Sequence, residues 1–234
     1  MFSVYFILLS SSIIHLPLLS PLDYIYIVQW AFSTTGSIEG AYFLKTGTLK
    51  SFSEQQLVDC DKKSDQGCDG GLMDNAFDFI KQNKGLCTEA SYPYKGVDGT
   101  CKKSCTDDSK ATVKTHTDVD PTATALMSAI TKQPVSVAIE ADQSGFQFYK
   151  SGVFTAACGT TLDHGVLAVG YGTLGKKNNS TLVDGKQKKS KKFWKVKNSW
   201  GSSWGMNGFI LLERGKKQAG GQCGILNSAS YPTL

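Results

Sequence analysis

The sequence is short of the residues from which zinc sites and several hydrolase sites are built. It has only three histidines, and its seven cysteines form no C-x-x-C pair. Structural zinc sites usually need such pairs, so we expect no metal. H-E-x-x-H does not occur, so the usual metallopeptidase signature is absent. Nothing in the sequence indicates a cofactor.

Basic residues are missing from the start of the chain, where none precedes Lys45. Residues 1–28 are largely apolar, but a secretory signal peptide needs a basic n-region. Pro17 and Pro21 interrupt the segment as a membrane helix, so we expect no membrane partner. Two interpretations stay open: a signal-like or anchor-like segment, or non-native sequence such as a translated intron.

The net charge of +5 comes from one segment. Residues 174–192 hold seven lysines and one acid, without arginine or aromatic residues. Such a run is typical of a solvated loop, and we expect no nucleic-acid partner. Asn178 and Asn179 begin two overlapping N-x-S/T sequons in this insertion and are candidate glycosylation sites.

Seven cysteines favour disulfides and an oxidising compartment, and their odd number leaves one thiol without a partner. Together with the sequons, they suggest a lysosomal or secreted protein.

The first half of the chain has helical patterns. A helix is predicted over 29–45, with Gly47 as its C-terminal glycine. In a second helix ending near Cys60, Ser53 is expected to cap the start, Gln56 to reach back to it, and Phe52 to pack on Leu57. A third helix follows Gly70 and Gly71 and ends at Gly85; its predicted apolar face comprises Leu72, Met73, Ala76, Phe77 and Ile80.

The second half has mainly strand patterns. After a short helix at 121–130, strands are predicted at 135–139, 165–171, 193–197 and 209–212. This order predicts an α+β fold with a helical lobe over 29–117 and a β-rich lobe over 118–234. We place the boundary near Thr117.

Three segments carry candidate chemistry: "WAFSTTGSIEG" from Trp30, "LDHGVLAVGYG" with His164, and "VKNSWGSSWGMNGF" with Asn198 and Trp200. Taken singly, each has an ordinary structural explanation: a surface histidine, a turn-capping asparagine and core tryptophans.

Together with "SFSEQQLVDCD", "GCDGGLMDNAF", "SYPY" and "CGI...ASYP", these segments make the chain from Trp30 to Leu234 resemble the papain-like cysteine peptidases, in particular the cathepsin L-like branch. The resemblance implies two lobes, helical on the left and β-barrel-like on the right, with an active-site cleft between them. It also implies proteolysis of protein or peptide substrates, cystatin-like inhibitors as partners, and a monomer.

The resemblance assigns roles to three residues. His164 matches the histidine that pairs with the nucleophilic thiolate, Asn198 the asparagine that orients it, and Trp200 the indole that shields their hydrogen bond. A cysteine should stand at the head of the central helix, but Gln29 occupies that position. The oxyanion-hole glutamine falls near Asp23. We therefore predict that the chain as written is inactive, and that Ser33, one helical turn on, lies too deep to substitute.

Substrate-binding positions also follow from the resemblance. Gly70 and Gly71 match the glycine pair whose backbone binds an extended peptide. The pocket for the second side chain before the scissile bond (P2) is expected from Leu72, Met73, Ala138, Gly165 and Ser228, with a preference for apolar or aromatic groups. An alternative for Leu72 and Met73 is that they belong to the helix core.

The resemblance further implies the pairs Cys60–Cys101 and Cys158–Cys223, and Cys87 and Cys105 are placed to pair with each other. Cys68 is left unpaired, because Tyr26 stands where its partner would be.

Three hypotheses remain: an endopeptidase represented by a defective sequence, a non-catalytic peptide-binding decoy or regulator, and a chain that does not fold stably. The first predicts that genomic DNA has a splice acceptor at the Gln29 codon.

Overall fold

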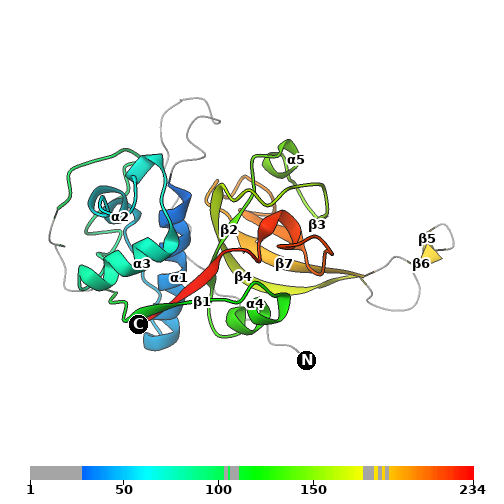
Figure 1. Ribbon diagram of the computed structural model, residues 1–234, viewed down its shortest axis with the longest axis horizontal. Coiled ribbons are helices and arrows are strands. Elements are labelled where there is room, and N and C mark those ends of the chain that lie inside the picture. The colour runs from blue at the N-terminus through cyan, green and yellow to red at the C-terminus, as the bar shows by residue number, and fades with distance from the viewer. Residues whose placement is uncertain (1–27, 103–104, 106–110, 176–181, 184–185, 188–189) are drawn as a thin grey trace.

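The computed structural model describes residues 28–102, 105, 111–175, 182–183, 186–187 and 190–234. Segment 1–27, which includes Asp23 and Tyr26, and the sequons at Asn178 and Asn179 lie outside the described residues. Helices α1 to α3 gather on one side of the molecule and a sheet occupies the other (Figure 1).

Helix α1 (Gln29–Thr46) packs against both the other helices and the sheet. It ends at Gly47, whose φ of 72° is left-handed and whose N–H bonds to the Phe43 carbonyl, as the sequence predicted. Its glycines allow close packing: a Cβ on Gly40 would lie 2.5 Å from Pro134. The small residues of this helix therefore bring the two halves of the molecule together.

Helix α2 (Glu54–Cys60) begins as expected at Ser53, whose hydroxyl accepts the Gln56 N–H at 2.9 Å. Phe52 and Leu57 are both fully buried in the helical core. The second half of the predicted capping box is wrong. The Gln56 side chain does not reach back; its Oε1 accepts the buried N–H of Cys87 at 2.7 Å. Gln56 Oε1 bonds to this backbone N–H from a distant segment, because a buried N–H without an acceptor would cost free energy.

Helix α3 (Met73–Gln82) follows a short 3₁₀ turn, η1 (Gly67–Asp69). Its apolar face is buried in the helical core, with one correction: Leu72 is 61% exposed. Leu72 has extended backbone angles and precedes the first helical residue, so the helical period does not apply to it. The end is as predicted, with the Gly85 N–H bonded to the Ile80 carbonyl.

The sheet has seven strands in the order β1-β9-β2-β4-β7-β8-β3 and does not close, since β1 and β3 stand at its two edges. Among its described strand pairs, only β3–β8 is parallel. The strands are β1 (Thr115–Asp118), β2 (Val135–Ile139), β3 (Val153–Phe154), β4 (His164–Leu174), β7 (Lys191–Lys197), β8 (Phe209–Glu213) and β9 (Ala229–Thr233).

The four predicted strands are confirmed as β2, β4, β7 and β8, whereas β1, β3 and β9 were not foreseen. Helix α4 (Ala123–Ile130) begins two residues later than predicted, where the Thr122 hydroxyl accepts the Ala125 N–H. Two further short elements, α5 (Ser144–Gln147) and η2 (Gln222–Gly224), connect strands.

The lysine-rich insertion is not a loop along its whole length. Strands β4 and β7 continue into it, so that Leu174 pairs with Lys191. Beyond them β5 (Leu182–Val183) pairs with β6 (Lys186–Gln187), and this hairpin stands away from the body of the molecule (Figure 1). The prediction of a loop over 174–192 is therefore wrong at both ends, because the flanking strands extend their ladder into it.

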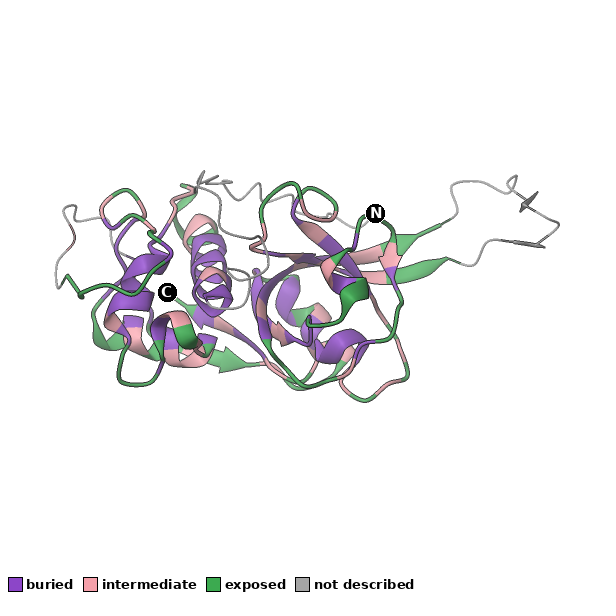
Figure 2. Cartoon of the chain, turned by 90° about the horizontal axis from the view of Figure 1, so that it is seen from above, coloured by how far each residue is buried: buried purple, intermediate pink, exposed green. Residues whose placement is uncertain are grey.

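Two separate hydrophobic cores lie on either side of α1, and buried residues gather in both halves (Figure 2). The helical core centres on Phe52 and Phe77, and the β-rich core on Phe146 and Trp194. The two-lobe α+β prediction is confirmed, with an open sheet in place of a closed barrel. The expected boundary at Thr117 falls within β1, which pairs with β9 and packs on α3; the division at that residue stays a prediction.

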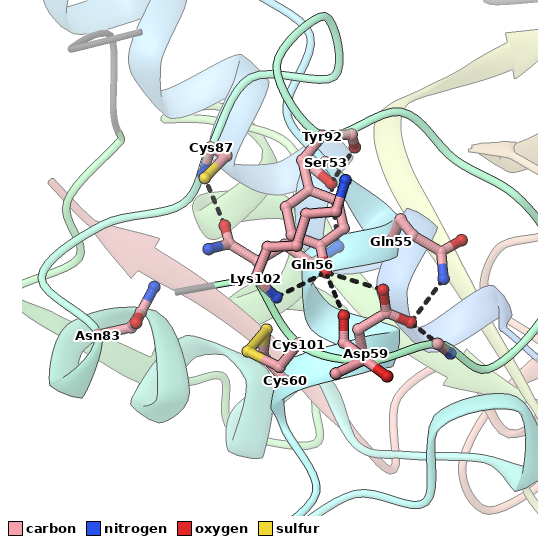
Figure 3. The surroundings of a disulfide bond; sticks show 12 residues. Ser53, Gln55, Gln56, Asp59, Cys60, Asn83, Cys87, Tyr92, Cys101 and Lys102 are labelled. Atoms are coloured by element: carbon pink, nitrogen blue, oxygen red, sulfur yellow. Dashed lines mark hydrogen bonds between the residues drawn. A yellow bond between two sulfur atoms is a disulfide. The ribbon is translucent and has the colours of Figure 1, made fainter. Parts of the chain in front are cut away.

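The described residues form three disulfides, each as expected: Cys60–Cys101, Cys87–Cys105 and Cys158–Cys223, with Cys68 free. A polar network lies beside the first of them (Figure 3). In it Asp59 accepts hydrogen bonds from the Tyr92 hydroxyl at 2.8 Å and from Gln55 Nε2 at 2.7 Å. The helical lobe is thus fastened by two disulfides and by buried hydrogen bonds.

Candidate active site

His164 and Asn198 meet because the strands that carry them are neighbours. His164 is the first residue of β4, and Asn198 directly follows β7, its antiparallel partner. Antiparallel pairing places the start of one strand beside the end of the next. His164 Nε2 lies 2.8 Å from Asn198 Oδ1, and both residues are buried.

The tautomer of His164 follows from its neighbours. Asn198 Oδ1 also accepts the Ser199 N–H at 2.8 Å, which identifies this atom as the carbonyl oxygen. Nε2 must therefore carry the proton, and Nδ1 carries a lone pair. Nδ1 is buried and has no hydrogen-bond partner within the described part of the chain. Burial lowers the pKa of His164 to about 4, against the opposing effect of the Asn198 bond, so the ring is neutral above pH 5.

Aromatic rings surround the histidine. The Trp200 ring centroid lies 5.0 Å from that of His164, and Phe146 packs edge-on against both at 6.3 and 5.6 Å. Trp204 extends this cluster, with its ring centroid 5.1 Å from that of Trp200 and 5.4 Å from that of Phe146. An apolar cover of this kind strengthens a hydrogen bond by excluding water, which is the role expected of Trp200.

A pocket of about 250 Å³ lies between the lobes beside His164. Its walls contain all seven residues that were predicted to bind substrate: Gly70, Gly71, Leu72, Met73, Ala138, Gly165 and Ser228. They come from both lobes and from segments up to 158 residues apart in sequence. Met73 belongs to the helical core and also lines the pocket, whereas Leu72 lines the pocket and is 61% exposed.

Gln29 lines the same pocket as His164, at the first residue of α1. The start of this helix and β4 are in close contact: a Cβ on Gly165 would lie 3.1 Å from the Trp30 nitrogen. On the opposite wall, a Cβ on Gly71 would lie 2.6 Å from the Trp30 ring. The glycines therefore allow two backbone segments to approach the helix end at which Gln29 stands.

No described side chain replaces the missing thiol. Ser33 is buried and donates its hydroxyl proton to the Val166 carbonyl at 2.7 Å, as its predicted depth requires. Cys68 does not line the pocket, and burial, with Asp98 nearby, raises the pKa of its thiol to about 11. A thiol with so high a pKa is a poor nucleophile at neutral pH.

Four pocket residues were not predicted as site residues: Trp30, Asp74, Leu162 and Asp163. Asp163 precedes His164 and Asp74 follows Met73, so adjacency to predicted residues was the available signal. Asp163 Oδ1 accepts the Ala141 N–H at 2.8 Å, and Ser230 donates its hydroxyl proton to Asp74. Both carboxylates are thus held in place at the pocket wall.

Comparison with known proteins agrees with this geometry. The model of a family described as "Papain family cysteine protease" matches residues 28–233. The chain belongs to the papain family. Its relatives include vignain of Ricinus communis, 52% identical over 204 residues, and the KDEL-tailed cysteine endopeptidase CEP2 of Arabidopsis thaliana, 50% identical over 204 residues. In both cases the match covers 87% of this chain and 53% of the relative.

Solved structures of papain-family enzymes have the same fold. The Carica candamarcensis cysteine protease CMS1MS2, solved in complex with E-64, superposes with a TM-score of 0.77 at 35% identity and 89% coverage of both chains. The proform of the ragweed pollen protease Amb a 11 gives a TM-score of 0.79 at 41% identity, covering 88% of this chain and 59% of the other.

Family membership and fold, both expected from the sequence, are confirmed by these matches. The chain spans about half the length of the curated relatives it matches. Among the described residues, no helix is long and apolar enough to cross a membrane.

Proposed function

We propose that this chain, with Gln29 at its present position, binds extended peptides in the cleft between its lobes and does not cleave them by thiol chemistry. The supporting observation is that Gln29 and His164 line one pocket together with the residues expected to bind substrate. The papain-family reaction is endoproteolysis, and the chain retains the part of that machinery that the β-rich lobe supplies.

The chemical reason lies in the side chain of Gln29. A carboxamide has no ionisable proton and cannot become the anion that attacks a peptide carbonyl. It can still donate and accept hydrogen bonds, and Nδ1 of the neutral His164, which has no partner among the described residues, can accept one. Those groups suit the binding of a peptide carbonyl or amide, and they make a decoy or regulator the non-catalytic function that best fits the site.

The proposed ligand is an extended peptide with a bulky apolar or aromatic side chain in the pocket. Leu72, Met73 and Ala138 supply its apolar wall, and Ser228 is uncharged. Asp74 and Asp163 also lie at the wall, but each accepts a hydrogen bond from the protein itself. For a cleavable form of the protein, we propose the same preference at the P2 position.

We further propose that the protein is lysosomal or secreted and acts as a monomer. Its three disulfides support this location, because such bonds persist in oxidising compartments. Cystatin-like inhibitors, which would enter the same cleft, are proposed as partners, and Asn178 and Asn179 as glycosylation sites.

Restoring the thiol tests the proposal. We expect the unmodified chain to show no turnover of a dipeptidyl aryl-amide substrate at mildly acidic pH, and Q29C to gain activity. Loss of a catalytic nucleophile costs about 10⁶-fold in kcat, and loss of one oxyanion donor about 10²–10³-fold. Because the oxyanion glutamine is also replaced, a gain of about 10³-fold is expected for Q29C.

Matched variants separate the possible outcomes. Gln29→Ala removes the amide without adding a thiol and should stay inactive, and adding His164→Ala to Q29C should remove the gain. Turnover by the unmodified chain would contradict the proposal. Peptide affinity is measured in parallel by tryptophan fluorescence, because Trp30 lines the pocket. An inactive chain without peptide affinity would also overturn it.

A further inference from the structure

A second cluster of polar side chains lies where strand β1 faces helix α3, at the edge of the helical lobe. His116 and Asp118 are two residues apart on the strand, and Asp74 and Asp78 are four residues apart on the helix. These spacings place each pair on one face of its element. The packing of α3 on β1 therefore brings the four side chains together.

The distances between them are short. Donor atoms of Asp74, His116 and Asp118 all lie within 4.8 Å of one another. The two nitrogens of the His116 ring face different carboxylates: Nε2 lies 3.9 Å from Asp118, and Nδ1 lies 3.4 Å from Asp78. The imidazole is thus set between acidic groups on both of its polar edges.

This cluster contains three carboxylates and one imidazole. Within the described part of the chain, no lysine or arginine forms an ion pair with Asp74, Asp78 or Asp118. Like charges at such distances repel, and a bound cation would remove the repulsion. Asp74 is also oriented by the Ser230 hydroxyl, which leaves its carboxylate fixed before any ion arrives.

We propose that Asp74, His116 and Asp118 bind a divalent transition-metal ion, with zinc as the reference. An imidazole among the ligands favours such a metal over calcium or magnesium, which prefer oxygen alone. Zinc bonds to nitrogen and carboxylate oxygen are about 2.0–2.2 Å long, so donors 4.8 Å apart need only small side-chain movements to converge. Water completes the coordination, because the side chain of Asp118 is 77% exposed.

Asp78 faces the ring nitrogen of His116 that does not face the proposed ion. A metal-binding histidine commonly donates its other ring N–H to a carboxylate, which fixes the tautomer and makes the ligand more basic. His116 Nδ1 faces Asp78 in this way while Nε2 faces the proposed ion. The site was not foreseen from the sequence, because its residues come from two distant segments with no metal-binding spacing.

The proposed site is connected to the cleft through Asp74, which also lines the pocket beside Met73 and Ser228. A bound ion would neutralise negative charge at that wall. The metal proposal does not depend on peptide binding, because its test measures the ion directly.

Zinc titration of the full chain by calorimetry tests the proposal. Cys68→Ser is used as the parent, so that the free thiol does not contribute. We expect one saturable site, weakened about 10–100-fold by His116→Gln or Asp118→Asn, and about tenfold by Asp78→Asn. Asp120→Asn, an exposed acid two residues beyond Asp118, is the matched control and should bind as the parent does.

A thermal melt of each variant with and without zinc gives a second readout, since an ion that binds only the folded state raises the Tm of the protein. The exposed Asp118 can be changed without disturbing the core, so loss of folding cannot mimic the expected result. Absence of saturable binding, or equal weakening by Asp118→Asn and Asp120→Asn, would overturn the proposal. So would binding that disappears only with His164→Gln, which would place the ion in the cleft.

Discussion

The two lobes of this molecule hold their buried acidic groups in opposite ways. In the helical lobe, burial raises the pKa of Glu39 to about 7 despite the opposing charge of Lys197, and raises that of Glu54 well above its usual range. In the β-rich lobe, burial also opposes ionisation of Glu140, but the N–H groups of Thr161 and Gly159 lower its pKa below the usual value. Glu140 accepts two backbone N–H groups, one at each oxygen, whereas Glu39 accepts one, from Phe52.

This contrast predicts opposite responses to pH. Glu39 takes up its proton more readily when folded, so its contribution to stability is complete below about pH 4.5 and is lost as the pH rises through about 7. Glu140 has the reverse sign, and its contribution is lost as the pH falls. His164 also favours neutral pH, because its folded pKa of about 4 lies below the ordinary histidine value. The helical lobe is therefore better suited to mildly acidic conditions than the β-rich lobe.

Glu39→Gln should have the largest effect on this contrast. The amide oxygen can still accept the Phe52 N–H and the Ser51 hydroxyl, but the buried charge is removed. We expect the free energy of unfolding to rise by about 2–3 kcal/mol at pH 8, since each pKa unit corresponds to about 1.4 kcal/mol. At pH 4.5 the change should be small.

Urea unfolding of both proteins from pH 4.5 to 8 measures the effect of Glu39→Gln. A flatter pH dependence in the variant supports the contrast between the lobes. An unchanged slope would show that Glu39 is not protonated in the folded lobe.

Glu140→Gln should act in the opposite direction. The Glu140 carboxylate accepts N–H bonds from Gly159 and Thr161, both at 2.6 Å. An amide has one oxygen and one NH₂ group, so one of those donors loses its acceptor. We expect a loss of about 2 kcal/mol at pH 7, the usual range for hydrogen bonds to charged groups. The loss should shrink as the pH falls, and chemical unfolding at pH 7 and pH 4 checks it.

Stabilisation of the Glu140→Gln protein at pH 7 would contradict the assignment. Read together, the Glu39 and Glu140 variants separate a general effect of losing a carboxylate from an effect specific to each lobe.

Gly40→Ala should have the smallest effect, at the contact between α1 and the β-rich lobe. The new methyl group would lie 2.5 Å from the rigid ring of Pro134, and overpacking of this kind costs about 1–2 kcal/mol. Gly36→Ala is the matched control. Its methyl group would meet the end of the flexible Leu167 side chain at 2.8 Å, so a smaller loss is expected.

Thermal melts of the two alanine variants compare these losses. An equal or larger loss for Gly36→Ala would show that the rigidity of Pro134 does not control how closely the lobes approach.

Local signals predicted much of the helical lobe and less of its contacts. The left-handed Gly47 and the Ser53 cap are short-range features, and both were predicted from a few neighbouring residues. Leu72 was misplaced because the helical pattern was extended one residue beyond its start. Strands β3 and β9 were missed because short strands are stabilised by the neighbours with which they pair.

The candidate site shows the same division. His164, Asn198 and the seven substrate-binding candidates were identified by their resemblance to a known family, as were the pairs Cys60–Cys101 and Cys158–Cys223. Asp74 and Asp163 line the pocket but had no sequence signal of their own, because the set of side chains that line it depends on how the two lobes pack together.

The sequence by itself determined the side-chain chemistry of this protein: a glutamine at the head of the central helix, a histidine and an asparagine at the ends of two strands, and an odd cysteine. Tertiary structure alone decided which ring nitrogen of His164 carries the proton and why the pKa values of Glu39 and Glu140 shift in opposite directions. It also decided that His116 lies near three carboxylates. The reason is that ionisation and ligand geometry depend on burial and on donors supplied by distant segments, which residue patterns along one chain do not specify.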